Sequence, residues 1–189
     1  MLESMKSPVG TGIPILLFFC AVLFLPCASW SQKRQFQFEQ FPAVVYQGPV
    51  HIPTGLHKDE KGAWRDALEK WVDEPEVTFA GEYYLAGHSC GTFCRDYQLF
   101  DLRTGKDIQG VDRFTCAEEP PKSPDGHPYL TILYSKPGSR LLIAEYHLDF
   151  DNPNKQETCR QQYFVLKSGK LQAISKTFSF CTEDHDGRQ

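Results

Sequence analysis

The sequence predicts a mainly β fold: an antiparallel meander, arranged as a sandwich, an open barrel or a blade-like sheet, with one amphipathic helix at its N-terminal end and disulfides that stabilise it. Three observations predict this class. At least six segments after residue 76 are rich in aromatic and branched residues, and turn signals separate several of them. Only one segment has the period of a helix. Five cysteines lie in the same part of the chain.

The first 31 residues have the layout of a secretory signal. Lys6 precedes an apolar run from Ile13 to Ala28, and small residues follow. A run of about 16 residues is shorter than the roughly 20 that a membrane-spanning helix needs. We therefore expect a cleaved signal at 1–31 and a periplasmic or extracellular protein. An uncleaved anchor and lipidation at Cys27 are the two alternatives, and Pro26 is unfavourable for the second.

The next two segments differ sharply in pattern. Residues 32–58 contain three prolines, many aromatic residues and no sustained period, which indicates an extended arm lying across the domain. In Asp59–Val72 (DEKGAWRDALEKWV), Trp64, Leu68 and Trp71 fall at i, i+4 and i+7, one face of a 3.6-residue repeat. We expect this segment to be an amphipathic helix with two tryptophans to bury.

The predicted helix opens a single β-rich domain, residues 59–181, and a flexible acidic tail follows at 182–189. The predicted strands are Val77–Ala86, Tyr97–Leu102, Tyr129–Tyr134, Leu141–Phe150, Cys159–Leu166 and Leu171–Phe180. The fourth strand alternates clearly, with apolar residues such as Leu142 on one face and Glu145 and His147 on the other. This alternation predicts one buried face and one wet face.

Charge excludes some classes of function. The chain has 20 basic and 24 acidic residues and a formal net charge of −4 at pH 7. Nothing in it resembles the basic surface that binds nucleic acid or anionic lipid. We therefore expect no nucleic-acid partner, and contact with a membrane only through an uncleaved or lipidated N-terminus.

The cysteines of the mature chain are disulfide candidates, because an exported protein meets an oxidising environment. They are Cys90, Cys94, Cys116, Cys159 and Cys181. Two bridges leave one sulfur over, which is free, joined to a partner or paired with Cys27. The sequence alone does not choose among the pairings.

Residues 87–94, GHSCGTFC, fit several kinds of chemistry. The first five spell GxSxG, but a nucleophile elbow needs a helix after the serine, and a predicted strand follows here. His88 and Cys90 project to the same face if the segment is extended, and an imidazolium would activate the thiol. We assign no catalytic residue, and keep a cysteine-dependent enzyme or redox protein using Cys90 or Cys94 with His88 as an alternative.

No metal or cofactor site is predicted. The C-x3-C spacing differs from the usual C-x2-C zinc knuckle, and the remaining histidines are scattered without ligand spacing.

Several short phrases occur in a characteristic order between residues 60 and 175. They are Phe79-Ala80-Gly81 with Tyr83, Cys90-Gly91-Thr92 with Cys94, Asp101 with Thr104-Gly105-Lys106, Ser139-Arg140-Leu141-Leu142, and Tyr163 with Gly169-Lys170-Leu171. This FAGxY, CGTxC, TGK and SRLL order resembles a widespread family of exported bacterial proteins that carry no assigned function. The resemblance implies a β-rich fold and an exported protein, and it implies no activity.

The chain departs from the pattern of that family at two places. Glu82 stands where the family has histidine, and His88-Ser89 replaces tryptophan-glycine. The resemblance also suggests that Cys90 or Cys94 bridges to Cys159. Such a bridge would close a loop of about 65 residues and stabilise the fold by about 4 kcal/mol in the chain-entropy model.

These observations favour a non-catalytic binding or inhibitor-type domain acting on a protein or polymer in the cell envelope. Its partner would be an envelope or secreted protein. Besides the cysteine-dependent alternative, a membrane-anchored structural protein of the envelope remains, held by its N-terminal segment and spaced by the proline-rich arm.

Overall fold

The computed structural model describes residues 36–91, 94–116, 121–149 and 158–181. The predicted signal at 1–31 and the acidic tail at 182–189 lie outside the described residues. None of the helices within these ranges has the length and apolar composition of a membrane span.

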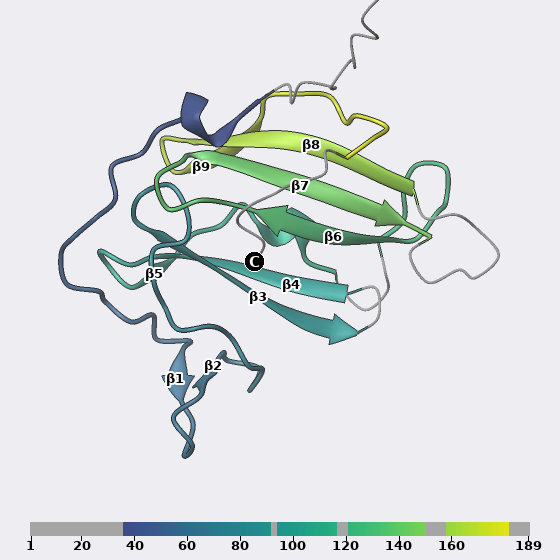
Figure 1. The fold of residues 1–189 in the computed structure, drawn as a ribbon. Helices are drawn as coiled ribbons and strands as arrows, with labels where there is room; N and C mark the ends of the chain where they lie inside the picture. Colours follow the sequence, from purple (N-terminus) through teal and green to yellow (C-terminus); the bar gives the residue numbers. More distant parts are fainter. Residues whose placement is uncertain (1–35, 92–93, 117–120, 150–157, 182–189) are drawn as a thin grey trace, which may run out of the picture. The chain divides into compact units, whose positions relative to one another are not determined.

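Most of the described strands belong to two antiparallel sheets (Figure 1). The first has the order β3-β4-β5, and its members are Tyr83–Gly91, Cys94–Asp101 and Lys106–Asp107. The second has the order β6-β7-β8-β9, and its members are Tyr129–Tyr134, Leu141–Leu148, Thr158–Lys167 and Lys170–Ala173. Every pair of neighbours is antiparallel. The prediction of a mainly β, antiparallel fold is therefore confirmed.

The two sheets face each other across a shared apolar core. Leu85 and Leu99 of the first sheet belong to the same buried cluster as Leu133, Leu142 and Phe164 of the second. Because alternate residues of a strand point to opposite faces, residues two apart, such as Leu142 and Ala144, point together into this core. Figure 1 shows β6, β7 and β8 above β3 and β4.

The outer face of the four-stranded sheet is also covered, so the prediction of a wet face on this strand is wrong. Ile143 is fully buried there and Glu145 is 3% exposed. The cover includes Phe38, which lies in the short 3-10 helix η1 (Phe38–Gln40) and packs in the same cluster as Ile143. Glu145 tolerates burial because its Oε1 accepts a 3.1 Å hydrogen bond from Nε2 of Gln161.

The prediction of a helix at Asp59–Val72 is wrong. Residues 57–72 form instead a two-stranded ribbon and tight loops, with β1 at His57–Lys58 and β2 at Trp64–Arg65. Asp59 explains the first loop, because its Oδ1 accepts 2.9 Å hydrogen bonds from two backbone N–H groups, those two and four residues later. Such local bonds compete with the hydrogen bonds of a helix.

Asp66 repeats this arrangement seven residues further along the chain. Its Oδ1 accepts 2.9 Å hydrogen bonds from the backbone N–H groups of Leu68 and Lys70. In both loops the third residue after the aspartate is left-handed: Gly62 has φ 82° and Glu69 has φ 61°. The seven-residue spacing of the two tryptophans therefore reflects two copies of one loop.

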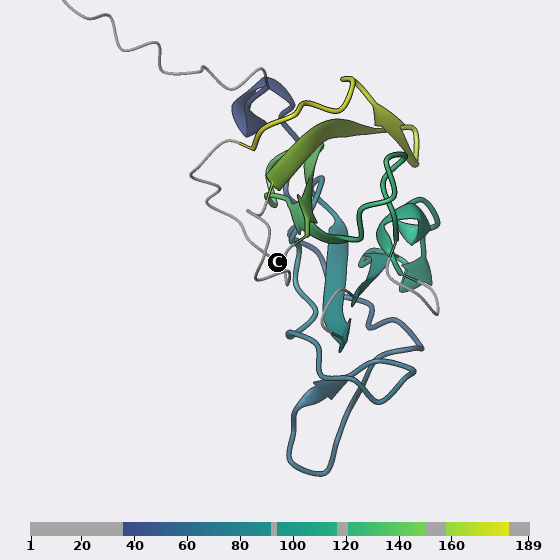
Figure 2. The same cartoon turned by 90° about the vertical axis from the view of Figure 1, so that its right-hand side faces the viewer.

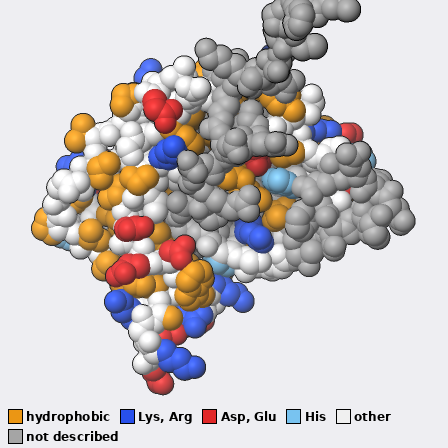
Figure 3. All heavy atoms as spheres, viewed as in Figure 1, with side chains coloured by type: hydrophobic (Ala, Val, Ile, Leu, Met, Phe, Trp, Pro, Cys, Tyr) orange, Lys and Arg blue, Asp and Glu red, His pale blue; other side chains and the backbone are white. Residues whose placement is uncertain are grey.

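We call residues 57–72 the lobe. It lies on the face of β3 and β4 that points away from the four-stranded sheet (Figures 1 and 2). Tyr84 and Phe100 are part of the separate apolar cluster beneath it. The surface of the lobe carries charges of both signs beside apolar side chains (Figure 3), and Trp71 is 57% exposed. Trp71 is thus exposed, whereas the helical pattern predicted that it is buried.

Candidate functional site

A cleft of about 590 Å³ lies at one end of the inner face of the four-stranded sheet. All four strands contribute to it, and so does the connection from β5 to β6, which contains the 3-10 helix η2 (Asp112–Phe114). Tyr146 and Leu148 of β7 and Gln162 and Phe164 of β8 line it. They continue the alternation that puts Leu142 into the core, so the cleft extends from that core.

The floor of the cleft is aromatic. The rings of Phe114 and Phe164 meet edge to face with their centroids 5.1 Å apart, and those of Tyr129 and Tyr146 meet in the same way at 5.3 Å. Such pairs prefer this geometry, because the edge of one ring is electropositive and the face of the other electronegative. The floor offers flat apolar surface to a ligand.

The rim of the cleft is basic. Arg113, Lys122 and Arg160 line it, and no carboxylate does so among the residues that the structure describes. The guanidinium of Arg113 lies 5.9 Å from the centre of the Phe164 ring, at the boundary between rim and floor. An anionic group with an apolar body therefore matches both parts of this surface.

Arg160 is held by an acidic residue beside the cleft. Its Nη2 donates to Oδ2 of Asp125 at 2.8 Å, and its Nη1 donates to Oδ1 at 3.3 Å. These bonds hold the pKa of the Asp125 carboxyl well below its usual range and raise the pKa of Arg160. The pair fixes the orientation of Arg160 and offsets its charge, which leaves Arg113 as a cation placed directly over the aromatic floor.

The tyrosines of the floor remain neutral phenols at physiological pH. Burial is the main cause that raises the pKa of both Tyr129 and Tyr146. The hydroxyl of Tyr146 donates to Oε1 of Gln162 at 3.4 Å, a long bond that a ligand oxygen can replace. The floor therefore supplies a hydrogen-bond donor as well as apolar area.

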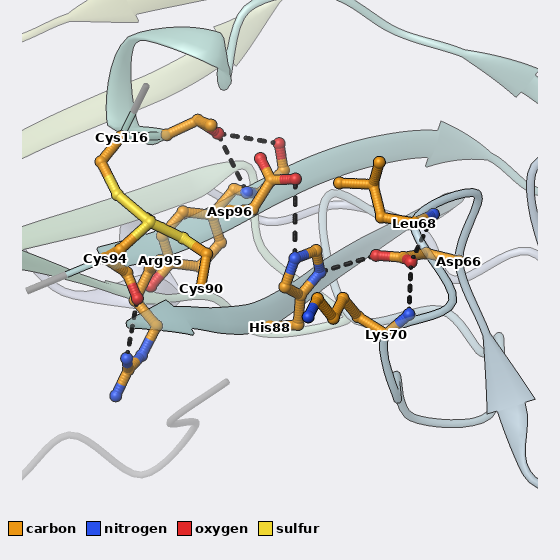
Figure 4. Close-up of polar contacts among 11 residues, drawn as sticks. Asp66, Leu68, Lys70, His88, Cys90, Cys94, Arg95, Asp96 and Cys116 are labelled. Atoms are coloured by element: carbon orange, nitrogen blue, oxygen red, sulfur yellow. Dashed lines mark hydrogen bonds and ion pairs between the residues drawn. A yellow bond between two sulfur atoms is a disulfide. The ribbon is translucent and has the colours of Figure 1, made fainter. Parts of the chain in front are cut away.

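None of the five cysteines singled out by the sequence lines the cleft, and three of them lie together. Cys94 is within disulfide-bonding distance of both Cys90 and Cys116. The Sγ atoms of Cys90 and Cys116 are 3.5 Å apart. Figure 4 shows the three sulfurs in one cluster beside β3 and β4.

The other two cysteines form a separate bridge, Cys159–Cys181. The bridge from Cys90 or Cys94 to Cys159 that the resemblance suggested is therefore wrong. The physical reason is the sheet topology: Cys159 is the second residue of β8 in the four-stranded sheet, whereas Cys90 and Cys94 belong to β3 and β4 of the facing sheet.

His88 contacts carboxylates. Its Nδ1 lies 2.7 Å from Oδ2 of Asp66, and its Nε2 lies 3.8 Å from Oδ2 of Asp96 (Figure 4). The 2.7 Å contact joins the carboxylate of Asp66 to the imidazole ring, and both side chains are buried. The ring nitrogens of His88 are thus engaged with acids instead of with the sulfur of Cys90.

The GxSxG stretch does not form a nucleophile elbow. Ser89 lies within β3, and its hydroxyl donates to the carbonyl of Gly91 at 3.2 Å while it accepts from Arg95 at 3.0 Å. β3 leads into β4, as the sequence indicated, instead of into a helix.

The residues of the cleft were not identified from the sequence. Tyr146 was placed correctly on the inner face by the alternation of its strand, but Arg113 and Phe114 come from an irregular connection with no period. Comparisons of the chain with models of known protein families, with curated proteins and with solved structures find no match.

Proposed function

We propose that the protein is a non-catalytic binding domain that acts outside the cytosol. Its cleft receives an anionic, partly apolar group of a secreted or envelope protein, such as an acidic chain terminus next to an aromatic residue. The observation that carries this proposal is the aromatic floor of Phe114 and Phe164 with Arg113 directly above it.

The size and chemistry of the cleft support this class of ligand. A volume of about 590 Å³ falls within the roughly 300–1,000 Å³ typical of pockets that enclose small ligands. Arginine recognises carboxylates through two parallel N–H donors, and the aromatic floor excludes water around that contact. An anion bound there gains charge-assisted hydrogen bonds in an environment of reduced dielectric constant.

The cysteines support the proposed location. All five that lie within the described residues are at disulfide distance from another cysteine. Disulfides persist in secreted and periplasmic proteins and are rare where glutathione and thioredoxin keep thiols reduced.

The test uses the aromatic sulfonate 8-anilinonaphthalene-1-sulfonate, whose fluorescence increases in apolar surroundings. We expect saturable binding of one molecule to the native chain. Arg113→Ala should weaken binding by about three- to tenfold, the effect of losing one charge-assisted contact. Tyr146→Phe should weaken it less, because it removes one hydroxyl and keeps the ring.

The matched control is Lys58→Ala, which removes one positive charge from the lobe, where Lys58 lies 4.9 Å from the centre of the Trp64 ring. This variant should bind the probe as the unmodified chain does. Binding that is unsaturable, or equal losses in the Arg113 and Lys58 variants, would contradict the proposal. Displacement of the probe by peptides ending in an acidic and an aromatic residue then supports a protein target, and failure of such peptides excludes it.

A further inference from the structure

The cluster of Cys90, Cys94 and Cys116 contains three sulfur atoms, and one disulfide joins only two of them. Cys94 is central, because it is within bonding distance of both neighbours while these are 3.5 Å from each other. A sulfur atom forms only one disulfide at a time. The two bonding contacts of Cys94 therefore exclude each other, and they correspond to Cys90–Cys94 with Cys116 left over or to Cys94–Cys116 with Cys90 left over.

Bonds other than the disulfide hold these sulfurs in place. The backbone N–H of Cys116 donates to the carbonyl of Arg95 at 3.1 Å. The hydroxyl of Thr115 accepts from the backbone N–H of Tyr97 at 3.0 Å and donates to its carbonyl at 3.3 Å. This segment is thus attached to β4 independently of sulfur, so the cluster stays assembled in either arrangement.

The other side of the cluster is positioned by an irregularity in the β3–β4 hairpin. The register shifts between Ser89 and Gly91, so that Gly91 pairs with Cys94. This bulge brings Cys90 beside the strand that carries Cys94. Cys90 is exposed, whereas Cys94 and Cys116 are less so. The two arrangements consequently differ in whether the leftover sulfur is at the surface.

We propose that the three cysteines form an internal thiol–disulfide exchange site that presents Cys90 to disulfides in solution. In the exchange step the thiolate of Cys116 attacks the Sγ of Cys94, the Cys94–Cys116 bond forms, the Cys90–Cys94 bond breaks, and the electron pair leaves on the sulfur of Cys90. One S–S bond forms and one breaks, so no external oxidant or reductant is needed.

The exposed thiolate of Cys90 then reacts with a small disulfide of the type RSSR. A bond forms between Cys90 and one sulfur of the disulfide, the S–S bond of that molecule breaks, and RS⁻ leaves with the electron pair. The product is a mixed disulfide at Cys90. The site belongs to the sulfur cluster alone, and its existence does not rest on the cleft or on any ligand of the cleft.

The first experiment maps the thiol in the full chain, purified without reductant, denatured in acid and alkylated with N-ethylmaleimide. Trypsin leaves Cys90 and Cys94 in the peptide 71–95 and Cys116 in the peptide 114–122, apart from the peptides of the other cysteines. We expect one label for the cluster, divided between Cys90 and Cys116. Label on neither, or equal label on all three, would overturn the proposal.

The second experiment incubates the native chain with oxidised glutathione and measures the added mass. We expect one glutathione, located at Cys90. Cys116→Ser leaves only the Cys90–Cys94 bridge and should abolish the addition, although Cys90 itself is unchanged. Cys90→Ser, which leaves Cys94–Cys116, should abolish it too. Glutathione at Cys90 of the Cys116→Ser variant would refute the exchange step.

Each of these variants keeps one bridge in the cluster and the separate Cys159–Cys181 bridge, so near-ultraviolet circular dichroism should match that of the unmodified chain. A variant that fails this control is replaced by a kinetic measurement on the unmodified chain. In the native chain a slow alkylating reagent should label mainly Cys90. Because exchange turns the thiol of Cys116 into a thiol at Cys90, the share of the label on Cys90 should rise with time. A fixed ratio of the two labels over time would contradict the proposal.

Discussion

Oδ2 of Asp66 lies 2.7 Å from Nδ1 of His88, and this contact joins the lobe to β3. The side chains are 1% and 6% exposed, respectively. The same carboxylate closes its own loop through Oδ1, which accepts two backbone N–H groups. One buried side chain therefore determines both the local shape of the lobe and its attachment to the sheet.

Asp66→Asn should destabilise the fold by about 1–3 kcal/mol, because it removes the charge facing a buried imidazole. The asparagine keeps a carbonyl oxygen for the loop, so the substitution isolates the contact with His88. Urea unfolding followed by tryptophan fluorescence measures the difference. Asp59→Asn is the control, since Asp59 makes the same loop but pairs with the partly exposed Arg65. Equal losses in the two variants would show that the buried contact with His88 contributes no more than the partly exposed pair of Asp59 with Arg65.

Gly81→Ala should cost far more than Gly62→Ala. Both glycines are left-handed, with φ 86° and 82°, so alanine is strained at both by about 1 kcal/mol. A Cβ at Gly81 would in addition collide with the carbonyl oxygen of Val44, whereas a Cβ at Gly62 meets open space.

The collision at Gly81 also affects the segment that contains Val44 and Tyr46, because the carbonyl of Gly81 accepts a 2.7 Å hydrogen bond from the N–H of Tyr46. We expect the Gly81→Ala variant to melt at a lower temperature and to be cleaved faster by protease near Tyr46. Similar melting of the two alanine variants would mean that the collision is relieved without cost.

The carboxyl of Asp125 should titrate below its ordinary value of 3.8, because Arg160 stabilises its charged form. A depressed pKa stabilises the folded state above the ordinary value, and the stabilisation is lost as the pH falls through the folded-state pKa. Arg160→Gln should bring the titration of Asp125 back towards 3.8. Carbon-13 chemical shifts of the carboxyl groups measure this.

Asp59 is the internal reference for that titration. Its pKa is lowered mainly by the hydrogen bond from the backbone N–H of Ala63, with Arg65 as a smaller cause. It should therefore stay low in the Arg160→Gln variant. A shift of both carboxyls would indicate a general change of structure instead of the loss of one ion pair.

The sheets could be predicted because the signal for a strand is local. Tyr129–Tyr134 has the same bounds in prediction and structure, and β7 differs from its prediction only at its end. The sequence could not distinguish the predicted helix at Asp59–Val72 from the two loops that the structure contains. Trp64 and Trp71 are seven residues apart, which fits two turns of a helix and also fits two copies of a loop closed by aspartate. The hydrogen bonds that the side chains of Asp59 and Asp66 accept favour the loops, and such bonds leave no trace in the spacing of apolar residues.

The pairing of cysteines and the cover of the outer face depend on contacts distant in sequence. Cys159 of β8 pairs with Cys181, because the segment after β9 returns to β8, where Phe178 bridges to Gln161. Glu145 alternates like a solvent-facing residue, yet Gln161 on the neighbouring strand satisfies it and permits its burial. The cleft was not predicted for a related reason. Arg113 lies in an irregular connection, where the sequence pattern does not indicate which way a side chain points.

One short piece of chain serves two places in the molecule. Phe114 packs on Phe164 in the cleft, and two residues later Cys116 reaches Cys94. If the proposed sulfur arrangements differ in how they hold Phe114, a molecule bound in the cleft shifts the balance between them by the same factor by which that balance changes its affinity. Disulfides in solution that react at the sulfur cluster, and molecules that bind in the cleft, would then affect each other through the three residues 114–116.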